Sequence, residues 1–129
     1  MDVGKKAAAG AAIALGLAVT GAMPAMAKDG DVIRQGSCTR KTDWKVKASP
    51  ENGRIEVEGE VDSNRSGQVW RWRIVHNGSL SARGKRTTRG RSGSFEVRRV
   101  VVNIRGTDRI VFWAKHRRSG EVCRGTVHF

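Results

Sequence analysis

The sequence predicts an all-β protein built as a sandwich of two antiparallel sheets, and three observations support this prediction. After residue 27 the chain has 13 Val and five Ile against one Leu and three Ala, and β-branched side chains favour pleated strands over helices. Apolar and polar residues alternate in several short windows, as in strands with one buried face. About seven such windows follow one another at spacings near ten residues, which is typical of two-sheet sandwiches.

The expected strands can be placed in order along the chain. They centre on residues 44–48, 55–61, 70–74, 80–82, 95–102, 110–114 and 122–127. The turn Pro50-Glu51-Asn52-Gly53 separates the first two, which are expected to form a hairpin or to face each other across the sandwich. Asn77-Gly78 favours a tight hairpin turn. Val100 to Val102 shift the alternation by one residue, which suggests a bulge or bend.

Residues 1–27 have the pattern of a cleaved secretory signal peptide. Lys5 and Lys6 precede an apolar run, Ala7 to Thr20, and Ala25-Met26-Ala27 provides small residues for cleavage. The run is shorter than the ~20 residues that span a bilayer, so we expect no stable membrane insertion. The mature protein is expected to be secreted, and extracellular or associated with the cell wall. Residues 28–37 are expected to be a flexible N-terminus and residues 38–129 to form the sandwich.

The two cysteines are expected to form a disulfide, because thiols oxidise outside the cytoplasm. A Cys38–Cys123 bond closes a loop of 84 residues, worth about 4 kcal/mol in the chain-entropy model. The competing possibility is a metal site that combines these cysteines with His76, His116 or His128. No C-x-x-C or H-x-x-x-H spacing is present to arrange such ligands, so neither a metal nor a cofactor is expected.

The stretch from Gly106 to Ala114 resembles the entry to the penultimate strand of immunoglobulin-like domains, in which Asp precedes alternating bulky residues and then a small one. The chain departs from the antibody pattern, since it has no corner Tyr and its cysteines join the terminal strands. Cys38, Trp44, the segment from Arg86 to Arg99 and the segment from Gly120 to Arg124 together resemble small secreted Ig-like β-sandwich proteins of actinobacteria. This resemblance covers roughly residues 38 to 124 and brings no characterised activity with it.

The charge is strongly positive and unevenly distributed. The chain has 25 Lys+Arg and 12 Asp+Glu, a net charge of +13. Without residues 1–27 the counts are 23 and 11, which gives +12. The acids Glu56, Glu58 and Glu60 share one strand face, and a strand carrying Arg71 and Arg73 beside them would neutralise part of both rows.

A basic segment from Ala82 to Gly93 has no acid within it, and we expect it to continue a weak strand as a loop. Its cations are the candidate anion-binding residues: Arg83, Lys85, Arg86, Arg89 and Arg91. Guanidinium groups bind phosphate or carboxylate in bidentate fashion. The alternative is a solvated basic surface that serves solubility or general attraction to the cell wall.

The tryptophans divide into two groups by strand alternation. Trp70 and Trp72 are expected in the core with Trp44, Phe95 and Phe112, on the face opposite Arg71 and Arg73. Trp113 lies on the other face of its strand from Phe112 and is the best candidate for an exposed aromatic residue near Lys115.

No arrangement of residues indicates catalysis. The three histidines lie at turns and at the C-terminus, and no G-x-S-x-G motif is present. We therefore expect a monomeric, non-catalytic extracellular binding module for an anionic polymer or surface, such as teichoic acid, an anionic lipid surface or extracellular nucleic acid. The alternatives are a protein-binding module, an inhibitor or adhesin acting through exposed loops, and a cationic antibacterial factor.

Overall fold

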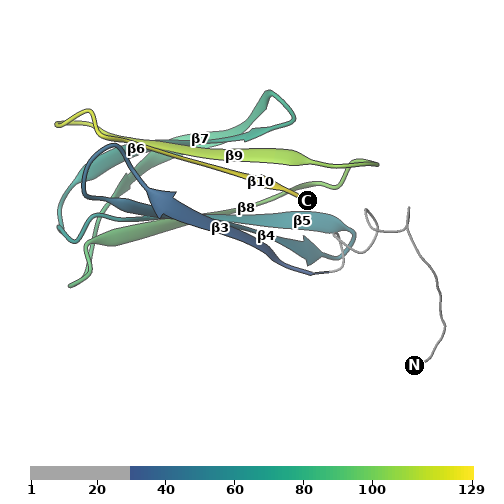
Figure 1. Ribbon diagram of the computed structural model, residues 1–129, viewed down its shortest axis with the longest axis horizontal. Coiled ribbons are helices and arrows are strands. Elements are labelled where there is room, and N and C mark those ends of the chain that lie inside the picture. Colours follow the sequence, from purple (N-terminus) through teal and green to yellow (C-terminus); the bar gives the residue numbers. More distant parts are fainter. Residues whose placement is uncertain (1–29) are drawn as a thin grey trace. The chain divides into compact units, whose positions relative to one another are not determined.

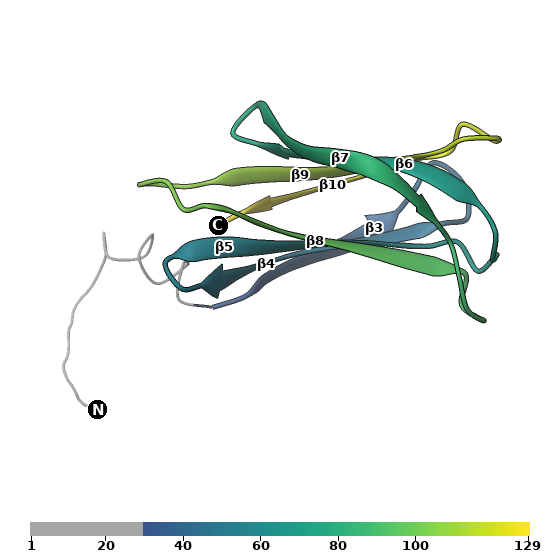
Figure 2. The ribbon, with the colours of Figure 1, turned by 180° about the vertical axis from the view of Figure 1, so that it is seen from behind.

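The computed structural model describes residues 30–129, and the expected signal peptide lies outside these described residues. This part of the chain is all-β, with two four-stranded antiparallel sheets and no helix (Figures 1 and 2). Its strands are β3 (Val32–Ser37), β4 (Asp43–Glu51), β5 (Arg54–Asp62), β6 (Val69–His76), β7 (Ser79–Thr87), β8 (Ser94–Val102), β9 (Arg109–His116) and β10 (Val122–His128). One sheet has the order β3-β4-β5-β8 and the other β10-β9-β6-β7. The predicted all-β sandwich is confirmed.

Strand β3 is the element that the sequence pattern did not reveal. It lies within the segment expected to be flexible and pairs with β4 from Val32 opposite Ala48 to Ser37 opposite Asp43. Its residues Arg34, Gln35 and Gly36 break the apolar alternation, because β3 is an edge strand with little buried surface. The described part of the chain therefore has eight strands where about seven were expected.

The core lies between the sheets, where the inward rows of both meet. Trp70 and Trp72 are 0% and 1% exposed, as predicted. Phe112 packs against the backbone of β5 at Gly59, where a Cβ atom would lie 2.4 Å from Phe112 Cδ1. A glycine is therefore required at this position by the bulk of the facing ring.

The predicted disulfide is confirmed and ties the two sheets together at one edge. Cys38 follows β3, Cys123 lies in β10, and their Cα atoms are 4.3 Å apart. Trp44 packs beside this bond, against Gly36 and Gly125 of the two edge strands. The terminal parts of the domain are thus held together by both a covalent bond and the half-buried ring of Trp44.

Two details of the strand predictions need correction. The segment expected to be a loop after Ala82 continues as β7 to Thr87, because its backbone remains paired with β6 up to Val69. The bulge expected at Val100 to Val102 is absent, since β8 pairs with β5 in one unbroken register. Arg99 occupies the inward row of β8 between Val97 and Val101 but remains exposed, and its guanidinium carbon lies 5.1 Å from the Trp72 ring centre.

The expected neutralisation of Arg71 and Arg73 by the Glu-rich strand is also wrong. Strand β5 lies between β4 and β8, whereas β6 belongs to the other sheet. The acids and these two arginines therefore face solvent on opposite sides of the sandwich. Within the described residues, no helix is long and apolar enough to cross a membrane.

Candidate functional site

Charge in this domain is divided between the sheets. Strands β6, β7, β9 and β10 contain eight Lys and Arg residues and no Asp or Glu. Strands β3, β4, β5 and β8 contain seven acids and six Lys and Arg. One sheet therefore carries all of the net positive charge of the strands.

The register brings the cations of the basic sheet onto one surface. Arg71 lies opposite Lys85 of β7 and Lys115 of β9. One row further, Arg73 lies opposite Arg83 and Trp113, and Trp113 lies opposite Arg124 of β10. We call the exposed residues Arg71, Arg73, Arg83, Lys85, Lys115 and Arg124 the basic face. Strands are about 4.8 Å apart and alternate residues about 6.7 Å apart, so these cations form a dense array.

No carboxylate within residues 30–129 forms an ion pair with the basic face. The cations stand opposite one another across neighbouring strands, an arrangement that costs free energy in the unliganded protein. The array can recover this free energy by binding an anion that lies over several cations at once.

Trp113 lies in the middle of the basic face and is half-buried. The guanidinium carbon of Arg73 is 4.0 Å from the centre of its ring, a cation–π contact worth about 0.5–1 kcal/mol at an exposed site. The prediction that Trp113 faces outward is confirmed, but Arg73 covers part of the ring. The contact holds Arg73 over the face and leaves its charge available.

The outer face of the other sheet has paired charges. Lys45 lies 3.9 Å from Glu60, Lys47 lies 4.0 Å from Glu58, and Arg98 lies 3.5 Å from Glu56. Burial raises the pKa of Glu96, and the neighbouring carboxylates Glu58 and Glu60 raise it further. This face is locally self-neutralised or acidic, and it does not match an anionic ligand.

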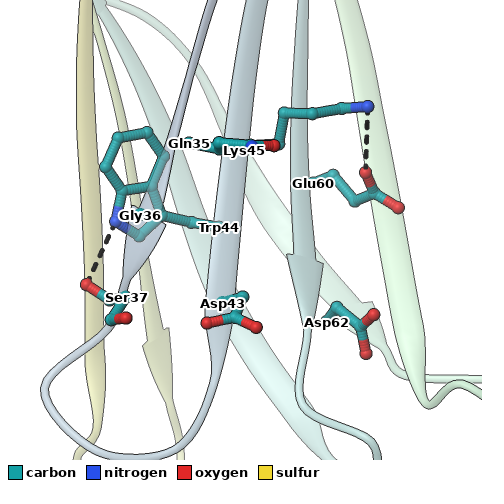
Figure 3. Close-up of a pocket in the computed structure, with 8 residues that line it drawn as sticks. All are labelled: Gln35, Gly36, Ser37, Asp43, Trp44, Lys45, Glu60 and Asp62. Carbon is teal, nitrogen blue, oxygen red and sulfur yellow. Dashed lines mark hydrogen bonds and ion pairs between the residues drawn. The ribbon is translucent and has the colours of Figure 1, made fainter.

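A hollow of about 420 Å³ on this second sheet illustrates the contrast (Figure 3). Three acids, Asp43, Glu60 and Asp62, line it. Lys45 forms an ion pair with Glu60, and Trp44 Nε1 donates a hydrogen bond to the Ser37 carbonyl at 3.2 Å. Asp43 and Asp62 stand directly opposite each other on β4 and β5. The hollow is therefore unsuited to the anions that the basic face would attract.

The five candidate residues from the sequence do not form one site. Arg83 and Lys85 lie on the basic face, whereas Arg86 lies on the other side of β7, opposite Trp70. Arg89 and Arg91 lie in the connection between β7 and β8. In a strand, side chains that are adjacent in sequence point to opposite faces of the sheet. A loop would not have separated these cations in this way.

Sequence reasoning missed four members of the basic face: Arg71, Arg73, Lys115 and Arg124. Each was visible as an outward residue of its own strand. What was missing was the order of the strands, which places β6 between β7 and β9. A second group of cations, described below, gathers where the loops meet.

The described residues contain no group of three or more His, Cys, Asp or Glu side chains that could hold a metal ion. In comparisons with known proteins, no family model, curated protein or solved structure matches the chain.

Proposed function

We propose that the protein is a non-catalytic binding module for linear polymers of repeated phosphodiesters, and that the basic face is its binding surface. The observation that carries this proposal is the acid-free sheet face on which six cations from four strands stand in register. Fixed strands keep the cations in place before binding, which lowers the entropy lost on association. Their regular spacing suits a chain with a charge in every repeat.

The composition of the face favours a polyanion over a protein partner. Protein interfaces depend on central apolar or aromatic anchors, and the one aromatic ring of the basic face is half-covered by Arg73. Four of the five exposed large apolar side chains of the described residues, Ile33, Val100, Val102 and Ile104, lie outside this sheet, and the fifth, Leu80, lies on β7 opposite Val75, at the margin of the basic face. A protein-binding module acting through the loops would not need the basic face.

Secretion belongs to the proposal as well. A structural disulfide is typical of proteins that fold outside the cytoplasm, and Cys38 and Cys123 form one. In that setting the available phosphodiester polymers are teichoic acids and released nucleic acid. Both present the same repeating anion to the basic face.

The strand order supports assignment of the sandwich to the immunoglobulin-like class. Counted from β4, the second strand pairs with the fifth, β5 with β8, and the third with the sixth, β6 with β9. Immunoglobulin-like sandwiches have these same central pairs. On this assignment β3 is an added strand beside the first.

The test is a comparison of two variants that lose equal charge. The variant R71Q/R73Q/K115Q removes half of the basic face, and the control R34Q/R54Q/R105Q removes three exposed arginines outside that face. With a 20-residue oligothymidylate at 0.1 M salt, we expect the face variant to bind about 100-fold more weakly, since each phosphate contact releases a counterion. The control should lose less than about threefold.

Two further probes separate the possible sources of the anion. Poly(glycerol phosphate) should show the same loss in the face variant, whereas binding only to phosphatidylglycerol vesicles would show that the face recognises a lipid surface instead. Equal losses in the two variants would show that net charge, and not the basic face, determines binding, and the proposal would then be abandoned.

A further inference from the structure

The connections at one end of the sandwich form a concave, cationic site that borders the basic face, since Lys85 of that face and Arg117 of this end line a common depression. The β3–β4, β5–β6 and β9–β10 connections lie at this end, on the left in Figure 1 and on the right in Figure 2. They surround a depression of about 630 Å³, which adjoins a second of about 670 Å³. We call this pair the loop-end groove; its charged or titratable lining residues are Arg40, Lys41, Arg65, His116, Arg117, Arg118 and Glu121.

Glu121 is the carboxylate of the loop-end groove, and its oxygens are already occupied. Its side chain accepts hydrogen bonds from Thr42 Oγ1 at 2.8 Å and from the backbone N–H groups of Thr42 and Arg40, both at 3.0 Å. Glu121 is 7% exposed. Within the described residues, no ion pair neutralises the guanidinium groups of the groove.

The wall of the groove is held in place by hydrogen bonds between two loops. The Gly67 N–H donates to the Thr88 carbonyl at 2.8 Å, and the Thr88 N–H donates to the Gln68 carbonyl at 2.9 Å. The buried hydroxyl of Thr88 donates to the Arg65 carbonyl at 2.5 Å. Arg65 therefore projects from a fixed backbone, and less entropy is lost when its side chain grips a ligand.

His116 presents a hydrogen-bond donor to the groove. Its ring stacks on Trp70, with 5.2 Å between ring centres, and its Nδ1 lies 2.7 Å from Ser119 Oγ. Ser119 Oγ accepts the Glu121 N–H at 3.1 Å, which leaves the hydroxyl proton free for His116 Nδ1. The neutral ring then carries its proton on Nε2. No described residue hydrogen-bonds to this nitrogen.

The neutral form of His116 is favoured by its surroundings. Burial lowers the pKa of the ring most, and Arg118 and Arg40 lower it further, while Glu121 acts in the opposite direction. A neutral ring keeps the Nε2–H as a donor and adds no further charge to the cluster.

We infer that the loop-end groove binds a compact oxyanion, a phosphate monoester or a sulfate ester, held by Arg65 and Arg118 with the His116 Nε2–H as a third donor. Guanidinium forks match the oxygens of such groups, and a backbone-anchored donor fixes their orientation. The concave groove takes a single charged group, in contrast to the flat basic face that follows a chain. The inference does not depend on the function proposed for the basic face.

The experiment is an NMR titration of the protein with inorganic phosphate at constant ionic strength, observed at the His116 ring nitrogens. We expect saturable shifts with phosphate that chloride does not produce. The bound dianion should also raise the pKa of His116. It acts in the same direction as Glu121 and against the surrounding cations Arg40, Arg65, Arg117 and Arg118. Phenyl phosphate and sulfate serve as separate arms: binding of both defines a general oxyanion site, and binding of phosphate alone defines a phosphate-specific one.

A matched pair of variants connects the shifts to the groove. R65Q/R118Q should lose at least tenfold in phosphate affinity, whereas R71Q/R73Q on the basic face should stay within about twofold of the unmodified protein. If the first variant does not fold, Arg118→Gln alone gives the same comparison. Absence of saturable shifts at His116, or equal losses in the two variants, would overturn the inference. Oligothymidylate binding, which depends on the basic face, would be untouched by that outcome.

Discussion

At the scale of single residues, strand alternation settled which side of a sheet each residue occupies. Trp70, Trp72 and Phe112 could be placed in the core from their spacing alone, and Trp113 could be placed outside. The neighbours of Arg71 could not be found in this way. Its contacts depend on which strands flank β6, and pairing between distant strands leaves no local mark in the sequence.

Glu96 provides a prediction at this scale. It faces Glu60 across the β5–β8 ladder, and burial and neighbouring carboxylates raise its pKa. The folded state therefore binds this proton more tightly than the unfolded state, and the stability due to Glu96 falls as pH rises through the raised pKa. Glu96→Gln should increase the free energy of unfolding at pH 7 by about 0.3 kcal/mol, the size of a screened surface effect.

The check is denaturant unfolding of both proteins at pH 7 and below pH 4. The gain should disappear at the lower pH, where Glu96 is protonated in both states. The exposed Glu51, at the end of β4, serves as the control, and Glu51→Gln should give no gain. A loss of stability for Glu96→Gln at pH 7 would show that this carboxylate is favourable as it stands.

At the scale of elements, the sequence predicted strands with a clear alternating pattern and missed the irregular ones. The β6–β7 hairpin at Asn77-Gly78 was predicted and is present, and of the two arrangements expected for β4 and β5 the structure has the hairpin. Strand β3 was missed and β7 was ended too early, because both are edge strands with polar side chains. Edge strands are held by backbone pairing on one side, which the side-chain pattern does not record.

Gly59 offers a test of packing between elements. It lies in the middle of β5 against the ring of Phe112, without room for a Cβ atom. Gly59→Ala should destabilise the protein by about 1–3 kcal/mol, the usual cost of overpacking. Thermal unfolding against Gly30→Ala, where no atom lies within 4 Å of the added Cβ, provides the comparison. Equal stability of the two variants would mean that the sheets separate easily at this point.

At the scale of the whole molecule, the disulfide compensates for a small core. It joins residues 85 positions apart and closes the β3–β10 edge. Replacing both cysteines, C38S/C123S, should lower the free energy of unfolding by about 4 kcal/mol, mainly because the unfolded chain is no longer constrained. Urea unfolding measures this difference. A change below about 1 kcal/mol would show that packing of Trp44 at this edge suffices on its own.

The largest feature at this scale is the segregation of charge between the two sheets. Net charge could be counted from the sequence, and the acid-free basic segment from Ala82 to Gly93 was evident. The division of charge between the two sheets is evident only from the pairing of β6 with β9 in the structure. Because of this segregation, the excess positive charge of the domain includes a defined surface of six cations, the basic face.

The most direct test of this account is the salt dependence of oligothymidylate binding to the unmodified protein and to R71Q/R73Q/K115Q. If all six cations of the basic face contact phosphates, log K should fall with log salt at a slope of about −4, and the variant should show about −2. The control R34Q/R54Q/R105Q should keep the slope of the unmodified protein. The same slope in all three proteins, or binding equally strong at 50 and 500 mM salt, would contradict the account.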